Sequence, residues 1–268
     1  GRIDAANNRV SVIPLAERQA AVEDISEDER RLLDGIRTME LVLVVDVTGS
    51  MNRVRAPLKQ ALKTLMQHME ERRRLGRPAI EQLTVKVGFV FYADMPTPAE
   101  DQDYWKTHVV KASEDYFQLS NESDYEALLQ FIADMPEAYG GDAPEQPFEG
   151  LKAAIDTFHL DRSRHTPGAN RLILLIGDAH NHPKDVKPHG ATQATRFSLA
   201  EATAMLQPVG QYDTGVAKIM LHGIYPRFRD PIGDTWKQQL KTLSRASGGA
   251  YYTVDFQQKD RQIVQQFE

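Results

Sequence analysis

The sequence predicts an α/β protein whose doubly wound, mostly parallel central sheet is flanked by helices. Four apolar runs of strand length occur along the chain, at 41–45, 85–92, 171–177 and 216–224. Such near-continuous runs are typical of parallel strands that are buried on both faces. Helical patterns separate the runs, and this alternation builds a parallel sheet. We expect the four runs to be neighbouring strands, with 41–45 inside the sheet, because a long apolar run is poorly tolerated at an edge.

The chain divides into two parts. Residues 1–39 are expected to form an N-terminal extension, and residues 40–268 are expected to form the main domain. Within the extension, 8–14 could add a short strand. Ser26 and Glu29 have the spacing of a capping box, which predicts a helix that leads into the sheet.

Capping boxes and helical periodicity predict the other elements of the main domain. Ser123 and Ser198 are each followed three residues later by a glutamate, so each is expected to begin a helix. In chain order, we expect helices at 53–74, 123–135, 145–158, 198–206, 234–246 and 256–267. Segments 108–111 and 116–119 could pair beside the second strand, and 250–254 is expected to be the last strand.

Composition narrows the class of protein. The chain has 268 residues, 41% hydrophobic and 26% charged, as in ordinary globular proteins. A net charge of −6 disfavours a nucleic-acid partner, and no apolar stretch is long enough to insert into a membrane. The absence of cysteine excludes disulfides, thiol catalysis and cysteine-type zinc sites. It also suits a periplasmic or other extracytoplasmic location, with the cytoplasm as the alternative.

Polar side chains follow the first apolar run at the position where α/β sheets bind ligands. Asp46, Thr48 and Ser50 are spaced two residues apart, and Gly49 allows a tight turn before the next helix. Oxygen ligands at the carboxyl end of a central strand favour a hard divalent cation. The alternative is a hydroxyl-rich turn in which Ser50 caps the helix.

The segment Asp-x-Thr-Gly-Ser-Met resembles the first loop of the metal-ion-dependent adhesion site (MIDAS) of the von Willebrand factor A (VWA) family, which normally reads Asp-x-Ser-x-Ser. Two later segments resemble the second and third loops of bacterial-type members. These are Tyr-Gly-Gly-Asp-Ala-Pro-Glu at 139–145 and Asp-Ala-His-Asn-His at 178–182. Ser-Gly-Gly-Ala-Tyr at 247–251 resembles the entry to the last strand of the family. The resemblance covers roughly residues 40–267 and implies a VWA, Rossmann-like fold.

The resemblance implies a Mg²⁺ (or Mn²⁺) site. Its ligands would be Asp46, Thr48, Ser50 and Asp178, with Asn52 and His182 around them. His182 is expected to hydrogen-bond the second loop.

One departure concerns the second loop, where much of the family supplies a threonine hydroxyl. No threonine lies between residues 124 and 156, so Asp142 or Glu145 is the candidate to replace it. A carboxylate there would make the site more negative than usual. Alternatively, either residue merely favours the N-terminus of the following helix.

The functional expectation is an adhesion-type protein-recognition module, not an enzyme. In the family, the cation binds an Asp or Glu carboxylate of a protein partner. One alternative is a metal-assisted hydrolase or phosphatase, with His182 or Glu145 as the base. Others are a metal-free structural domain and a zinc site formed by His180, His182 and His189, although solvated loop histidines are favoured over the latter. Similar regions occur beyond the kinase domain of bacterial Ser/Thr kinases linked to type VI secretion, and this chain could be the C-terminal region of such a protein.

Overall fold

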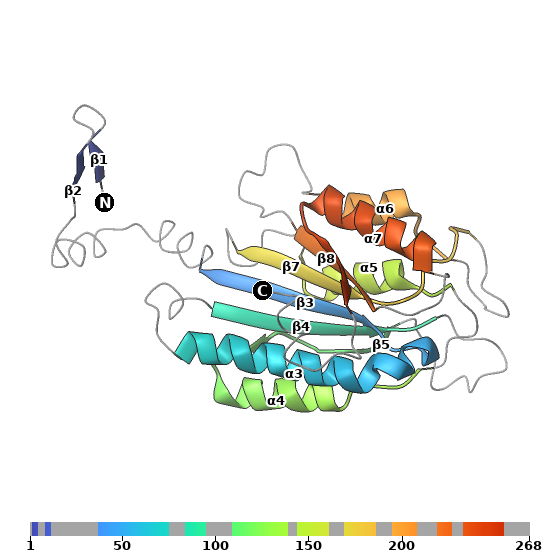
Figure 1. Cartoon of the computed structure of the whole chain (residues 1–268), viewed down its shortest axis with the longest axis horizontal. Helices are drawn as coiled ribbons and strands as arrows, with labels where there is room; N and C mark the ends of the chain where they lie inside the picture. Colours follow the sequence, from blue (N-terminus) through green and yellow to red (C-terminus); the bar gives the residue numbers. More distant parts are fainter. Residues whose placement is uncertain are drawn as a thin grey trace.

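A seven-stranded sheet forms the centre of the protein in the computed structural model (Figure 1). The structure describes residues 2–4, 9–11, 37–74, 84–94, 109–138, 144–160, 169–185, 195–207, 219–226 and 233–254. The strands of the sheet are β3 (Thr38–Asp46), β4 (Thr84–Tyr92), β5 (Val109–Ala112), β6 (Phe117–Gln118), β7 (Asn170–Ile176), β8 (Ile219–Pro226) and β9 (Tyr251–Val254). The helices are α3 (Asn52–Arg74), α4 (Glu122–Ala133), α5 (Pro147–Thr157), α6 (Leu199–Met205) and α7 (Gly233–Ser247).

The order of the strands confirms the predicted topology. It runs β5-β4-β3-β7-β8-β9, and β6 also pairs with β4. Strands β4, β3, β7, β8 and β9 are mutually parallel, whereas β5 and β6 are antiparallel to β4. The four apolar runs are therefore neighbouring strands, and β3 lies between β4 and β7, as predicted for the interior of the sheet.

Two helical layers bury the two faces of the sheet. Helices α3 and α4 lie on one side, and α5, α6 and α7 lie on the other (Figure 1). Leu41, Leu43 and Val45 face the first layer, and Val42 and Val44 face the second. None of the five side chains is more than 2% exposed. Side chains of this size each contribute about 1.5–3 kcal/mol when fully buried, which explains why this run lacks a polar face.

The N-terminal residues that the structure describes form a short antiparallel pair. Strand β1 (Arg2–Asp4) pairs with β2 (Arg9–Ser11), and β2 lies within 8–14, where a short strand was expected. The helix expected after Ser26 lies outside the described residues, as does the final helix expected at 256–267.

The helix starts confirm one expected cap and correct another. Ser198 and Glu201 form the predicted reciprocal capping box at the start of α6. Helix α4 is capped by Asn121 instead of Ser123, because the Asn121 side chain accepts hydrogen bonds from the backbone nitrogen and the hydroxyl of Ser123. Asn121 has the extended backbone of an N-cap, so the helix begins before Ser123 and includes it.

Candidate metal-binding site

The first and third loops meet because their strands are neighbours. Asp46 is the last residue of β3, and Asp178 follows β7 by two residues. The parallel register that pairs Val45 with Ile176 brings both loops to the same edge of the sheet. Between Asp46 and α3, the chain turns through a short 3-10 helix, Gly49–Met51, which carries Ser50.

Hydrogen bonds join Asp46, Thr48, Ser50 and Asp178, the four residues predicted from the first and third loops. The backbone nitrogen and the hydroxyl of Thr48 both donate to Asp46 Oδ1, at 2.9 and 2.7 Å. Thr48 Oγ1 lies 3.1 Å from Ser50 Oγ, and Ser50 Oγ donates to Asp178 Oδ1 at 2.9 Å. The two hydroxyl hydrogens must therefore serve three oxygen–oxygen contacts, so this cluster is one hydrogen short unless a carboxyl is protonated.

Glu145 is the second-loop residue that the structure brings to this cluster. Its backbone nitrogen donates to His180 O at 2.9 Å, and its carbonyl accepts from the backbone nitrogen of His182 at 3.2 Å. This short parallel bridge, which also pairs Glu145 with Asn181, fastens the second loop to the third. The Glu145 side chain is 2% exposed. Asp142, the other candidate, lies outside the described residues.

The carboxyl groups have raised pKa values because they are buried beside one another. Burial, followed by the charge of Asp178, raises the pKa of Asp46 to about 8. Burial raises the pKa of Asp178 as well. The pKa of Glu145 lies well above its ordinary value because of burial first, and then the charges of Asp46, Asp94 and Asp178. Negative charge gathered away from water must be balanced by protons or by a cation.

Two buried carboxylate oxygens are available for a cation. In the part of the chain that the structure describes, neither Asp46 Oδ2 nor Glu145 Oε2 has a hydrogen-bond partner. Carboxylate and hydroxyl oxygens are the ligands that Mg²⁺ and Mn²⁺ prefer. Within the described ranges, no three His, Asp or Glu side chains are arranged to hold a metal ion by themselves. The carboxylates of this site would therefore hold a cation together with the hydroxyls of Thr48 and Ser50.

His182 lies in the interior, between the second loop and the end of β4. Its imidazole is 4% exposed, so it is not a solvated loop histidine. Its Nε2 lies 3.2 Å from Asp94 Oδ1, and its backbone nitrogen donates to the carbonyl of Glu145 in the second loop. His189, which the zinc alternative requires, lies outside the described residues. Asn52 is exposed at the first position of α3.

Asp94, Tyr92 and Gly177 are site residues that the sequence reasoning missed. Asp94 is 2% exposed and lies two residues beyond the end of β4. Tyr92 ends that strand, in register with Asp46. A Cβ added to Gly177 would lie 2.3 Å from the Tyr92 hydroxyl oxygen, so only glycine leaves room for this phenol. Their position at the end of a strand next to β3 was the signal that could have identified Asp94 and Tyr92.

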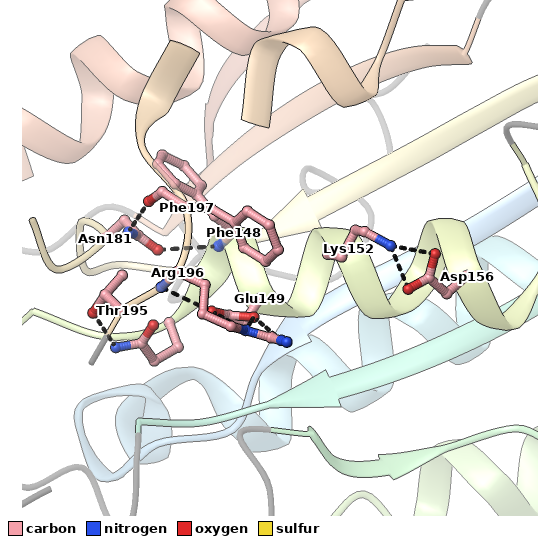
Figure 2. A network of polar contacts seen from close by, with 9 residues as sticks. Phe148, Glu149, Lys152, Asp156, Asn181, Thr195, Arg196 and Phe197 are labelled. Atoms are coloured by element: carbon pink, nitrogen blue, oxygen red, sulfur yellow. Dashed lines mark hydrogen bonds and ion pairs between the residues drawn. The ribbon is translucent and has the colours of Figure 1, made fainter. Parts of the chain in front are cut away.

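A network of buried polar contacts supports the second and third loops (Figure 2). The Asn181 side chain accepts from the backbone nitrogen of Phe148 in α5 and donates to the carbonyls of His182 and Phe197. Glu149, fully buried in α5, accepts hydrogen bonds from the backbone and the guanidinium of Arg196. This network joins α5, the third loop and the segment before α6. It therefore stabilises the third-loop residues that pair with Glu145.

Helix α7 holds the third loop from the other side. The indole nitrogen of Trp236, which is fully buried, donates to Gly177 O at 2.7 Å. The Gln239 side chain accepts from the backbone nitrogen of Asn181 at 3.0 Å. The backbone on both sides of Asp178 is therefore tied to one helix, and the carboxylate has a defined place.

The three loops suggest a relationship to a known protein family, and a family model matches the chain. The family model described as von Willebrand factor type A domain matches residues 40–266. The chain belongs to this family. The match begins two residues after the first residue of β3 and includes all three loops of the candidate site. No curated protein matches the chain.

Several solved structures are similar to the chain, all at low sequence identity. A pilus adhesin, SpaC from Lactobacillus rhamnosus GG, aligns at a TM-score of 0.50 and 13% identity, over 86% of this chain and 31% of the adhesin. The VWA domain of the type V pilus tip protein Mfa5 from Porphyromonas gingivalis aligns at 0.46 and 13%, over 85% and 93%. Proximal thread matrix protein 1 from the mussel byssus aligns at 0.48 and 15%, over 85% and 44%. The chain thus spans about a third of the length of the adhesin, and these similarities concern the fold.

Proposed function

We propose that this VWA domain is a divalent-cation-dependent protein-recognition module. The observation that carries the proposal is the convergence of Asp46, Thr48, Ser50 and Asp178 beside the buried carboxylate of Glu145. Such a cluster is short of positive charge, and Mg²⁺ or Mn²⁺ would supply it. One of the similar structures is a pilus adhesin, which agrees with a role in protein interaction.

The residues divide into an inner and an outer side of the proposed site. Asp46, Thr48 and Glu145 are each at most 2% exposed and would hold the cation from within. Ser50 is exposed, and Asp178 is partly exposed, so a partner would approach from their side. In this proposal, the cation offers a coordination position to an Asp or Glu carboxylate of the partner. Glu145, in place of a threonine, adds negative charge and weakens the attraction for that carboxylate.

The geometry favours binding over catalysis. Both candidate bases, Glu145 and His182, lie in the interior, and the imidazole of His182 faces Asp94. Ser50 donates to the carboxylate of Asp178, an arrangement that suits a ligand more than a nucleophile activated by a base. None of the described helices combines the length and the apolar character needed to cross a membrane. A kinase domain elsewhere in a longer protein, and a link to type VI secretion, remain hypotheses.

Calorimetric titration with Mg²⁺ and Mn²⁺ tests the cation site. Wild type should bind one cation, and Asp46→Asn should not, because the substitution removes the buried charge while keeping the shape. Glu126→Gln is the matched control, since Glu126 is exposed on α4. Equal cation affinity in wild type and Asp46→Asn would reject the assignment.

Capture experiments test the recognition role. A protein partner should be retained by the immobilised domain in Mg²⁺ and released by a chelator, and Asp46→Asn should retain none. The purified domain should not turn over phosphoesters, esters or peptides. Turnover that disappears in His182→Ala while Mg²⁺ binding persists would favour the hydrolase alternative.

A further inference from the structure

Tyr92 carries a buried hydroxyl that the proposed cation site has not yet used. The side chain is fully buried at the end of β4, and its hydroxyl has no hydrogen-bond partner among the described residues. A buried hydroxyl without a partner destabilises the folded state, so a phenylalanine would serve a purely structural role better. The hydroxyl therefore requires an explanation beyond packing.

The hydroxyl is directed at the carboxylates of the site. A Cβ built on Gly177 would lie 2.3 Å from the Tyr92 hydroxyl oxygen and 3.3 Å from Asp46 Oδ2. These two distances limit the separation of the oxygens to about 5.6 Å. Gly150 in α5 makes room on the other side, because a Cβ there would lie 2.9 Å from the phenol ring. Two glycines thus leave the space in which this phenol reaches the site.

The groups around the hydroxyl are carboxylates, which accept hydrogen bonds, so the hydroxyl can act as a donor there. Burial, followed by the charges of Asp46, Glu145 and Asp178, raises the pKa of Tyr92 well above its ordinary value, so the phenol keeps its proton. Asp46 Oδ2 and Glu145 Oε2 are the buried acceptors without a partner in the described part of the site. A water that makes two hydrogen bonds of about 2.8 Å at a tetrahedral angle spans about 4.6 Å, which lies within the limit of about 5.6 Å.

We propose that Tyr92 is a positioning residue of the cation site, whose hydroxyl donates to a water that bridges Asp46 Oδ2 and Glu145 Oε2. The bridge keeps the carboxylates of the first and second loops at a fixed spacing on the inner side of the site, away from Ser50. Without the hydroxyl, the water loses the group that holds it in place. The two carboxylates are then left with no donor between them, and their spacing is no longer fixed for a cation. This inference rests on the proposed function.

The test compares two tyrosine-to-phenylalanine variants by calorimetric titration with Mg²⁺. Tyr116 is the matched control, because its hydroxyl is also buried without a partner in the described structure, and burial followed by the charge of Glu40 raises its pKa. Glu40 belongs to the opposite end of β3 from Asp46, so Tyr116 lies far from the candidate site. Tyr92→Phe should weaken Mg²⁺ binding about tenfold, which is the effect of one hydrogen bond, and Tyr116→Phe should change it less than about twofold.

Two further readouts separate positioning from folding. Both variants should still unfold cooperatively in urea without cation, as wild type does, because neither hydroxyl bonds another protein group in the described structure. A crystal structure of the cation-free wild type should contain the bridging water, and that of Tyr92→Phe should not. Mg²⁺ affinity that is unchanged in Tyr92→Phe, or weakened equally in both variants, would overturn the inference while leaving the cation site intact. A wild type that binds no cation would overturn the proposed function and this inference together.

Discussion

Asp46→Asn should make the cation-free protein more stable while it removes cation binding. Asparagine keeps the shape of the side chain and an oxygen that can accept both hydrogen bonds from Thr48. It removes a carboxyl whose pKa rises from 3.8 to about 8 on folding. At pH 7, that shift costs the folded state up to roughly 4 kcal/mol, at about 1.4 kcal/mol per pH unit.

The same shift predicts how stability depends on pH. Between about pH 4 and pH 8, the folded state binds a proton at Asp46 that the unfolded state has lost. Protonation of the folded state lowers its free energy, so the free energy of unfolding of the cation-free wild type should fall as pH rises through this window. Asp46→Asn should make the free energy of unfolding less dependent on pH. At pH 7.5, its free energy of unfolding should be about 2 kcal/mol higher than that of wild type. We expect about half of the full cost, because Asp178 and Glu145 can adjust around residue 46 in both proteins.

Urea denaturation with a chelator, at pH 5.5 and pH 7.5, measures both effects. Glu126→Gln should follow wild type at both pH values, because Glu126 is exposed on α4. Saturating Mg²⁺ should then stabilise wild type, by about 2.7 kcal/mol at one hundred times its dissociation constant, and should leave Asp46→Asn unchanged. A wild type that becomes more stable from pH 5.5 to pH 7.5, together with an Asp46→Asn variant that is less stable at both, would refute the reasoning.

Three further substitutions separate the site from its scaffold. Glu145→Ala should weaken Mg²⁺ binding in a titration without lowering the thermal midpoint, since it removes a carboxylate that other carboxylates repel; unchanged affinity would exclude Glu145 from the site. Gly177→Ala should destabilise the protein by about 1–3 kcal/mol in urea denaturation, because the new methyl group would lie 2.3 Å from the Tyr92 hydroxyl; wild-type stability would show that the phenol moves freely. Ser198→Ala should cost about 1 kcal/mol through the lost cap of α6 and leave Mg²⁺ affinity unchanged, and a loss of cation binding would contradict this separation.

The sequence by itself was sufficient for the fold and for the first loop. Near-continuous apolar runs identified β3, β4, β7 and β8 as buried parallel strands, because burial on both faces leaves few positions for a polar side chain. The capping box at Ser198 could be predicted because its donor and acceptor groups lie within one turn of the chain. Asp46, Thr48 and Ser50 were readable because their spacing and their place after a strand are properties of one short segment.

Tertiary structure decided which residues surround that loop. Glu145 was one of two second-loop candidates, and the bridge between Glu145 and Asn181 places it against the third loop, whereas Asp142 lies outside the described residues. The pairing of His182 with Asp94 joins residues that follow different strands, so no local sequence pattern predicts it. Tyr92 was a strand residue like its neighbours until the register with Asp46 and the missing Cβ of Gly177 directed its hydroxyl at the carboxylates. Such contacts depend on which strand ends become neighbours, and periodicity along the chain carries no information about the side chains that then meet.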